Sequence, residues 1–81
     1  MSKTNALGFE IQKARFNHGF SRLDLTSKSG VASPTIQAIE EGKRYPKIST
    51  LIQISKGIEE NPQNQKDFFF KLLEIIWEES C

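Results

Sequence analysis

The residues best suited to binding chemistry in this chain are cations gathered in one short segment. Lys43, Arg44 and Lys47 place three positive charges within five residues. Cations clustered in this way bind the phosphates of a polyanion, with an affinity that falls as the salt concentration rises. The longer N-terminal part of the chain, which includes this segment, is also basic, and the C-terminal part is acidic. Residues 1–57 carry nine Lys or Arg against four Asp or Glu, and residues 58–81 carry two Lys or Arg against six Asp or Glu. Two interpretations remain open, a basic surface that meets a polyanion or charge that is merely solvated.

Catalysis and metal binding have no support in the residue types. The chain has one histidine, His18, and one cysteine, Cys81. It lacks a Cys–His pair, an HExxH motif and a phosphate-cradling glycine loop. We therefore predict no enzyme activity, no metal and no cofactor. A single cysteine cannot form an internal disulfide, which fits a cytoplasmic protein, and no apolar run approaches the ~18 residues that a membrane span needs.

Glycine and proline divide the chain into five predicted helices. With 81 residues there is room for one domain, and no segment alternates with period two, so the predicted fold class is all-α. The expected helices cover about residues 5–18, 21–28, 33–41, 49–58 and 62–80. Each has a candidate start signal: Asn5, Ser21 with Asp24 in capping-box position, Ser33 as the cap before Pro34 as the first helical residue, and Asn61 before Pro62.

Apolar residues at helical spacing predict which face of each helix points inward. The predicted inward positions are Leu7, Ile11, Ala14, Leu25, Val31, Ile36, Ile39, Ile48, Leu51, Ile54, Ser55 and Ile58. Thr26 is polar beside these positions, so its hydroxyl needs a partner. A backbone carbonyl of its own helix is the expected one.

Two short helices, joined by a glycine turn over residues 29–32 and followed by the basic loop 42–47, suggest a helix-turn-helix. Residues 7–58 resemble the phage repressor/Cro (Xre) family of such domains. The matching residues run in order and without gaps: Leu7-Gly8, Ile11, Arg15, Gly19-Phe20-Ser21, Leu25, Lys28-Ser29-Gly30-Val31, Ile36, Ile39-Glu40, Gly42-Lys43, Pro46 and Leu51. The resemblance implies a five-helix, repressor-like DNA-binding domain, expected over residues 6–60 behind a flexible N-terminus at residues 1–5.

The resemblance also implies which residues touch DNA. In the family the second helix of the motif lies in the major groove, with its N-terminal residues at base edges. Carried onto this chain, the implied base contacts are Arg22, Ser33, Pro34, Thr35, Gln37 and Ala38. Gln37 has the donor and acceptor for adenine, and Thr35 and Ala38 can touch a thymine methyl. Arg22 can hold a phosphate instead, and the alternative for the others is that they are simply exposed.

The implied phosphate contacts are Arg15, Asn17, Lys43, Arg44, Tyr45 and Lys47. For Tyr45 the alternative is packing under Pro46. Arg15 is also implied to face Glu40, as an ion pair between the first and third helices that fixes the orientation of the helix in the groove.

The last predicted helix is more apolar than one small core needs. Its apolar residues crowd ten positions: Phe68, Phe69, Phe70, Leu72, Leu73, Ile75, Ile76 and Trp77. We expect the Phe9 and Phe16 face of the first helix to cover one side and a second copy of the chain to cover another. Residues 61–81 are therefore the predicted dimerisation segment, with Phe70, Leu73, Ile76 and Trp77 as interface candidates. The alternatives are a helix sunk wholly in its own core and a surface for a different protein.

The most consistent function is a sequence-specific transcriptional regulator, in the first place a repressor, that binds a two-fold site on double-stranded DNA as a homodimer. An antitoxin or a restriction-modification controller would use the same fold. The rival from another class is a protein-interaction module that has lost DNA binding and uses Leu23 and the aromatic helix. Salt-dependent binding to random duplex DNA separates the rival from the regulators.

Overall fold

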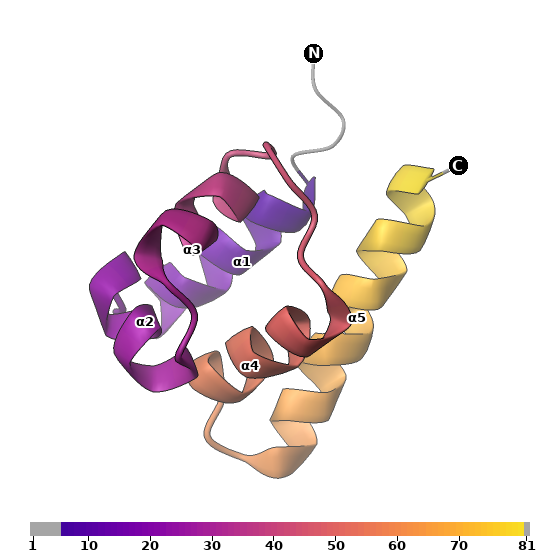
Figure 1. Ribbon diagram of the computed structural model, residues 1–81. Helices are drawn as coiled ribbons and strands as arrows, with labels where there is room; N and C mark the ends of the chain where they lie inside the picture. The colour runs from indigo at the N-terminus through magenta and orange to yellow at the C-terminus, as the bar shows by residue number, and fades with distance from the viewer. Residues whose placement is uncertain (1–5, 81) are drawn as a thin grey trace.

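The computed structural model of the chain describes residues 6–80, and the regular elements in that range are five α-helices. In chain order they are α1 (Ala6–Asn17), α2 (Arg22–Ser29), α3 (Ser33–Glu40), α4 (Ile48–Ile58) and α5 (Pro62–Ser80) (Figure 1). The all-α fold class and the five predicted helices are confirmed. The flexible N-terminus expected at residues 1–5, the Asn5 cap and Cys81 lie outside the described residues. No helix within residues 6–80 is long and apolar enough to span a bilayer.

The ends of α2 and the start of α5 follow from local sequence. The Asp24 carboxylate accepts from the Ser21 N–H at 2.9 Å, and the Ser21 hydroxyl accepts from the Asp24 N–H at 3.0 Å, which completes a capping box. The bond from the Ser21 N–H favours the ionised carboxylate and holds the pKa of Asp24 below its usual value. Gly30 ends α2 in the left-handed conformation, with φ of 79°. At the start of α5, Asn61 Oδ1 accepts from the Gln63 N–H at 2.8 Å.

The start of α3 differs from the prediction. The N-cap is Ala32, whose carbonyl accepts from the N–H groups of Thr35 and Ile36 at 3.0 Å each. Ser33 is therefore the first helical residue, not the cap, and Pro34 is the second. Proline is tolerated there because the first-turn N–H groups have no partner within a helix anyway. Since alanine has no side-chain oxygen, no side chain caps α3.

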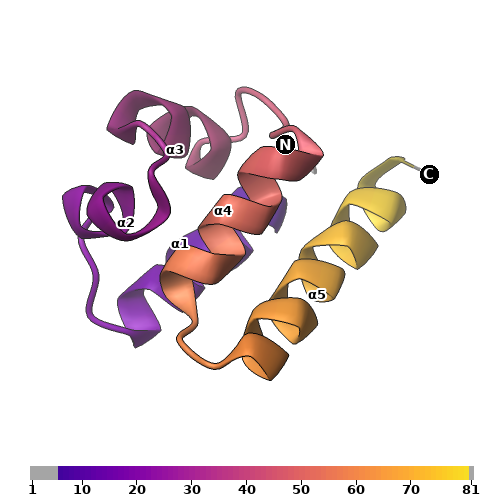
Figure 2. The same cartoon turned by 60° about the horizontal axis from the view of Figure 1, so that its bottom comes forward.

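The helices enclose one core, with α5 on the far side of α4 from α2 and α3 (Figure 2). The buried apolar residues are Leu7, Ile11, Ala14, Leu25, Val31, Ile36, Ile39, Leu51, Ile54, Ile58, Phe68 and Leu72. The inward faces predicted for α1 to α4 are thus confirmed, except at one position. Ile48 is the first residue of α4 and is 56% exposed, because the core begins at the next turn with Leu51.

Two glycines let the helices approach one another closely. A Cβ added at Gly8 would lie 2.4 Å from the carbonyl oxygen of Ile39 and 2.5 Å from that of Glu40, so α1 rests directly on the C-terminal backbone of α3. A Cβ at Gly57 would lie 2.7 Å from the Cβ of Ser29, where α4 meets the end of α2. Any larger residue would push these helix pairs apart, so the glycines fix the position of the motif in the bundle.

The aromatic face of α1 is not covered by α5, and that expectation is wrong. Phe9 and Phe16 are 60% and 61% exposed. The last helix instead inserts Phe68 and Leu72, which are four residues apart, into the common core. Contact with the core that α1 and α4 share buries these side chains more completely than one face of α1 could. A salt bridge of 2.9 Å from Lys71 Nζ to Glu10 Oε2 borders this contact.

The hydroxyl of Thr26 has no partner. Its Oγ1 is buried and makes no hydrogen bond within the described residues, so the carbonyl expected to accept it does not. A helix carbonyl can accept a second hydrogen bond, as the Leu51 carbonyl does from the Ser55 hydroxyl at 2.9 Å, but the Thr26 hydroxyl makes no such bond. A buried polar group without a partner costs about 1–3 kcal/mol.

Replacing Thr26 with the isosteric valine should therefore stabilise the protein. We expect Thr26→Val to raise the free energy of unfolding by about 1 kcal/mol, because the methyl group that replaces the hydroxyl needs no partner. Urea denaturation measures the change. Thr26→Ser is the matched control, since it keeps the hydroxyl, loses the methyl group and should not stabilise. A destabilised valine variant would show that the hydroxyl is bonded in solution.

Candidate functional site

The motif is held by one buried carboxylate between two arginines. Glu40 Oε2 accepts from Arg15 Nε at 2.8 Å, and Glu40 Oε1 accepts from Arg15 Nη2 at 3.0 Å and from Arg22 Nε at 3.0 Å. The Glu40 side chain is only 1% exposed. Arg15 comes from α1, Arg22 from the start of α2 and Glu40 from the end of α3. The carboxylate therefore ties three helices together at the back of α3.

This cluster changes the roles expected for the two arginines. The Arg15 side chain is 6% exposed, and its third nitrogen, Nη1, donates to the Phe20 carbonyl at 3.0 Å. Every nitrogen of its guanidinium has a protein acceptor and the side chain is buried, so little of Arg15 is left at the surface for a phosphate. The Arg22 side chain is 33% exposed and gives only Nε to Glu40. The outer edge of Arg22 thus remains at the surface beside α3.

The residues expected to reach base edges lie along the outer side of α3. Pro34 and Gln37 are exposed, and Ser33, Thr35 and Ala38 are half-buried. The inward residues Ile36 and Ile39 are buried in the core, which turns the other side of α3 toward solvent. The five predicted positions therefore all lie outside the buried stripe of α3, and the carboxylate cluster at the end of α3 fixes the orientation of the helix.

A short polar chain continues from this face into the basic loop. Gln37 Nε2 donates to Glu41 Oε2 at 3.0 Å, and Glu41 Oε1 lies 3.2 Å from Lys43 Nζ. The hydrogen bond from Gln37 and then that from Lys43 hold the pKa of Glu41 below its usual value. All three residues are exposed. Exposed pairs of this kind contribute only about 0.2–0.5 kcal/mol each, so breaking them to bind a ligand would cost Gln37 and Lys43 little.

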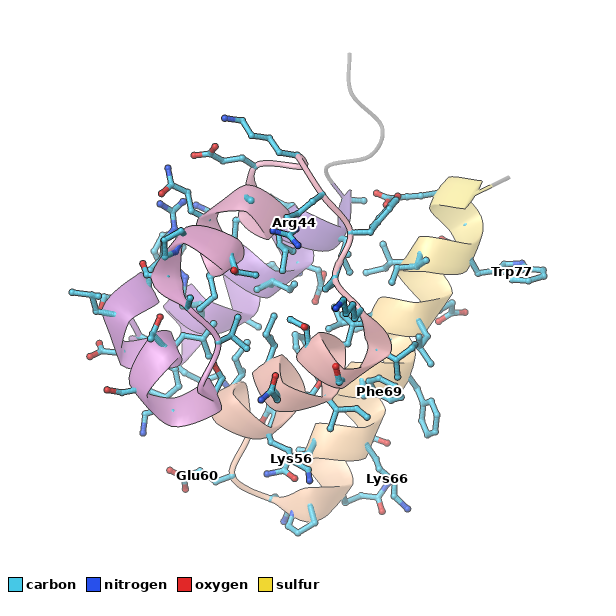
Figure 3. The ribbon with its side chains drawn as sticks, viewed as in Figure 1. Arg44, Lys56, Glu60, Lys66, Phe69 and Trp77 are labelled. Atoms are coloured by element: carbon cyan, nitrogen blue, oxygen red, sulfur yellow. The ribbon has the colours of Figure 1, made fainter. Side chains whose placement is uncertain are left out.

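The basic loop follows α3 directly and presents its cations to solvent. Lys43, Arg44 and Lys47 are all exposed, and the Lys43 side chain is 73% exposed. Arg44 marks this loop in Figure 3, whereas Lys56 and Lys66 lie at the opposite end of the bundle. Three of the predicted phosphate contacts are thus gathered next to the exposed face of α3.

Two other predicted phosphate contacts, Tyr45 and Asn17, differ from the three exposed cations of the loop. The hydroxyl of Tyr45 donates to the Glu79 carboxylate, which raises the pKa of Tyr45 above its usual value. A hydroxyl has one proton, so Tyr45 does not offer it to a phosphate while this bond lasts. Asn17 is exposed at the end of α1 and is separated from the start of that helix by roughly 16 Å. The basic loop meets α1 at the start, through Glu79, so Asn17 does not join the loop cations.

The candidates for a dimer interface on α5 divide into two kinds. Phe70 and Trp77 are 58% and 74% exposed, and Trp77 projects from the outer side of α5 (Figure 3). Leu73 and Ile76 are partly buried against the core. Phe70 and Trp77 are seven residues apart, so they lie on the same face of the helix two turns from one another.

Sequence reasoning missed two acidic residues of this region, Glu41 and Glu79. For Glu41 a signal existed, since it is four residues after Gln37, and side chains at that spacing meet on a helix. For Glu79 there was none, because its partners are 34 and 73 residues away in the chain.

Known proteins share this arrangement of helices. The helix-turn-helix family model HTH_3 matches residues 11–63. The chain is similar to the wild-type restriction-modification controller protein C.Esp1396I, with 30% sequence identity and a TM-score of 0.72 over 96% of this chain and 99% of that chain. It is also similar to the structure of C.Esp1396I bound to a 25 base pair operator site, with 30% identity and a TM-score of 0.71 over 95% and 97% of the two chains. A comparison with curated proteins gave no match.

Loss of the buried Glu40 carboxylate should strongly destabilise the protein. Glu40→Ala leaves Arg15 buried without a counter-charge, and we expect the free energy of unfolding to fall by about 3–5 kcal/mol. Denaturation by urea or heat measures the loss. Glu41→Ala is the matched control: the neighbouring residue has the same charge but is exposed, and its change should stay within about 0.5 kcal/mol. Equal effects of the two substitutions would contradict the structural role of Glu40.

Proposed function

The chain belongs to the HTH_3 helix-turn-helix family, and we propose that it is a DNA-binding transcriptional regulator whose helix α3 reads an operator site. The family expected from the sequence is thereby confirmed. The observation that carries the proposal is the exposed polar face of α3 with the basic loop beside it, on a helix whose orientation is fixed by Glu40. The operator-bound structure of C.Esp1396I supports it, because that chain matches this one over nearly its full length.

Base reading falls to Gln37, Thr35 and Ala38, with Ser33 and Pro34 at the start of α3. Gln37 presents an amide donor and acceptor, the pair that adenine matches in the major groove. Its bond to Glu41 is exposed and is exchanged for the base. Arg22 holds a phosphate or a guanine with the edge that Glu40 leaves free. The placement of these side chains outside the buried stripe of α3, or beside it for Arg22, supports these assignments.

Phosphate binding falls to Lys43, Arg44 and Lys47. Their charges are exposed and adjoin the reading face, so they add affinity for any duplex and make it salt-dependent. The N-terminus of α3 adds to this, because no side chain caps it and a helix N-terminus attracts phosphate. Arg15 is left out of the phosphate contacts, since its side chain is buried and each nitrogen of its guanidinium already has a protein acceptor.

A homodimer is the proposed active form. The longest dimension of the chain is 31 Å, whereas an operator of 25 base pairs such as that of C.Esp1396I is about 85 Å long. One chain of this size spans only part of such a site. Two copies related by two-fold symmetry would read two half-sites, and one short recognition helix alone reads too few base pairs to select a site in a genome.

The face of α5 that carries Phe70 and Trp77 is the proposed seam of this dimer. Large exposed aromatic residues on one helical face mark an interface more often than a solvated surface. Leu73 lies between them and is partly buried against its own core, and Ile76 lies beside Trp77. A different protein on the same face is the alternative partner.

Control of restriction and modification genes is a second candidate, narrower than the first. The observation that favours it is the match to C.Esp1396I, which covers 99% of that controller protein and 96% of this chain. The regulated genes define this role, and the fold is the same for both. In either case the proposed role is binding, with no catalytic step.

Selection of bound DNA from a random duplex pool tests the proposal. We expect an enriched site with two-fold symmetry and half-site centres about 34 Å apart. Binding without enrichment would leave a non-specific DNA-binding protein. Absence of any salt-dependent binding would favour a protein-interaction module instead.

Base reading and phosphate binding should separate in two single substitutions, each of which is the control for the other. Gln37→Ala should cost about 1–3 kcal/mol on the selected site and little on random duplex, because only a base contact is lost. Arg44→Ala should weaken binding to both DNAs and reduce the salt slope by about 0.9, which corresponds to one phosphate. Fluorescence anisotropy at several salt concentrations measures both effects. Equal losses of Gln37→Ala on both DNAs would remove its base-reading role.

Dimerisation should depend on the aromatic face of α5 and not on that of α1. We expect Phe70→Ser with Trp77→Ser to shift the chain from dimer to monomer in sedimentation equilibrium at micromolar concentration, because two large apolar contacts are lost from the seam. Phe9→Ser with Phe16→Ser is the matched control, since those aromatic side chains are also more than half exposed and seven residues apart on one helix. A wild-type chain that stays monomeric both free and on a two-fold site would refute the dimer.

A further inference from the structure

One carboxylate near the end of the chain joins three segments that are distant in sequence. Glu79 Oε2 accepts from the Ala6 N–H at 2.8 Å and from the Leu7 N–H at 3.3 Å. Glu79 Oε1 accepts from the hydroxyl of Tyr45. The start of α1, the basic loop and the last turn of α5 therefore meet at this side chain, and Figure 1 shows the three segments converging at the same end of the bundle.

Glu79 is itself held firmly. The first N–H groups of an α-helix have no partner within the helix, and the positive end of the helix dipole lies there. A carboxylate at this position is favoured on both grounds. The half-buried Glu79 side chain is thus fixed by α1 through one oxygen and presents the other to Tyr45.

Apart from the bond between Tyr45 and Glu79, few contacts hold the middle of the basic loop in place. Its first part is bound to the end of α3, since the Gly42 N–H donates to the Ile39 carbonyl at 3.1 Å and the Lys43 N–H donates to the Ala38 carbonyl at 2.9 Å. Its last residue, Lys47, is the N-cap of α4, and the Lys47 carbonyl accepts from the Leu51 N–H at 3.0 Å. Between these points, residues 44–46 make no backbone–backbone hydrogen bond within the described part of the chain. Tyr45 is 46% exposed, so packing holds it only in part.

We propose that Glu79 is a positioning residue for DNA binding, which acts through Tyr45 to hold Arg44 and Lys47 where they meet the phosphate backbone. This inference rests on the proposed function. It also makes the last turn of α5 part of the DNA-binding apparatus, although Glu79 contacts no DNA. A loop held in its binding position loses less conformational entropy when DNA binds, which raises affinity.

One substitution changes the affinity for DNA in opposite directions, depending on whether Glu79 acts by positioning the loop or only through its charge. Glu79→Ala removes a negative charge, so charge alone would strengthen binding to DNA. Positioning predicts the opposite, a loss of about threefold to tenfold in affinity on both the selected site and random duplex. Glu78→Ala is the matched control, because the neighbouring residue is exposed and carries the same charge. It should leave affinity unchanged or raise it slightly.

The path through Tyr45 is tested in the same assay. Tyr45→Phe removes only the hydroxyl and should weaken binding about as much as Glu79→Ala, and the double variant should be no weaker than either one. Tyr45 is the only tyrosine in the chain, so absorbance at alkaline pH reports its ionisation alone. Its pKa is raised by the Glu79 carboxylate, and Glu79→Ala should return that pKa toward the ordinary value, whereas Glu78→Ala should not.

Each outcome decides the matter. All variants are measured in full-length protein well below the melting temperature, which circular dichroism establishes. If Glu79→Ala strengthens binding while Tyr45→Phe weakens it, Tyr45 itself holds a phosphate and the positioning role is overturned. If Glu79→Ala behaves like Glu78→Ala, the positioning role is overturned and the proposed function stands. If the wild-type chain shows no salt-dependent binding to duplex DNA, both are overturned.

Discussion

The orientation of α3 depends on a single buried carboxylate. Glu40 is enclosed by three hydrogen bonds from Arg15 and Arg22, which belong to two other helices. A buried ion pair adds little net stability compared with apolar packing, but a packing that leaves one of these charges buried and unpaired costs several kcal/mol. We infer that the cluster serves mainly to exclude other orientations of α3. The close contact between Gly8 and the backbone of α3 also restricts the orientation of α3, since it leaves α1 and α3 no room to shift.

The same constraint separates cations that look alike in the sequence. Arg15 and Arg44 are both arginines of the basic half of the chain, yet Arg15 is 5% exposed with a protein acceptor at each guanidinium nitrogen, and Arg44 lies exposed in a loop. Burial decides this difference, because a phosphate reaches only a guanidinium that is open to solvent. Arg22 lies between the two cases, with one nitrogen on Glu40 and an edge at the surface. Counting positive charge therefore overstates the number of residues available to DNA.

Local spacing was enough to predict most of the fold, and long-range docking was not. The helices, the capping box at Ser21 and the inward faces of α1 to α4 follow from residues within a few positions of one another. The facing of Arg15 and Glu40 came from family resemblance, since nothing local couples residues 25 positions apart. Sequence spacing could not predict which side of α1 meets α5, nor that Thr26 would lack a partner, because both depend on how helices pack. The proposed DNA-reading residues were predicted as a set of positions, and the exposure of each is known only from the structure.

The position of α5 explains how an acidic helix coexists with a DNA-binding surface. It lies on the far side of α4 from α3, so most of its carboxylates are remote from the reading face. Glu79 is the exception, as the α5 residue that hydrogen-bonds to the basic loop. Its charge is offset by the positive end of α1, to which it is hydrogen-bonded through the Ala6 and Leu7 N–H groups. A carboxylate whose charge is partly offset in this way can order the loop with less repulsion of the phosphates that the loop is proposed to bind. Because the same helix carries the exposed face of Phe70 and Trp77, pairing of two chains along α5 would steady the turn that holds the loop.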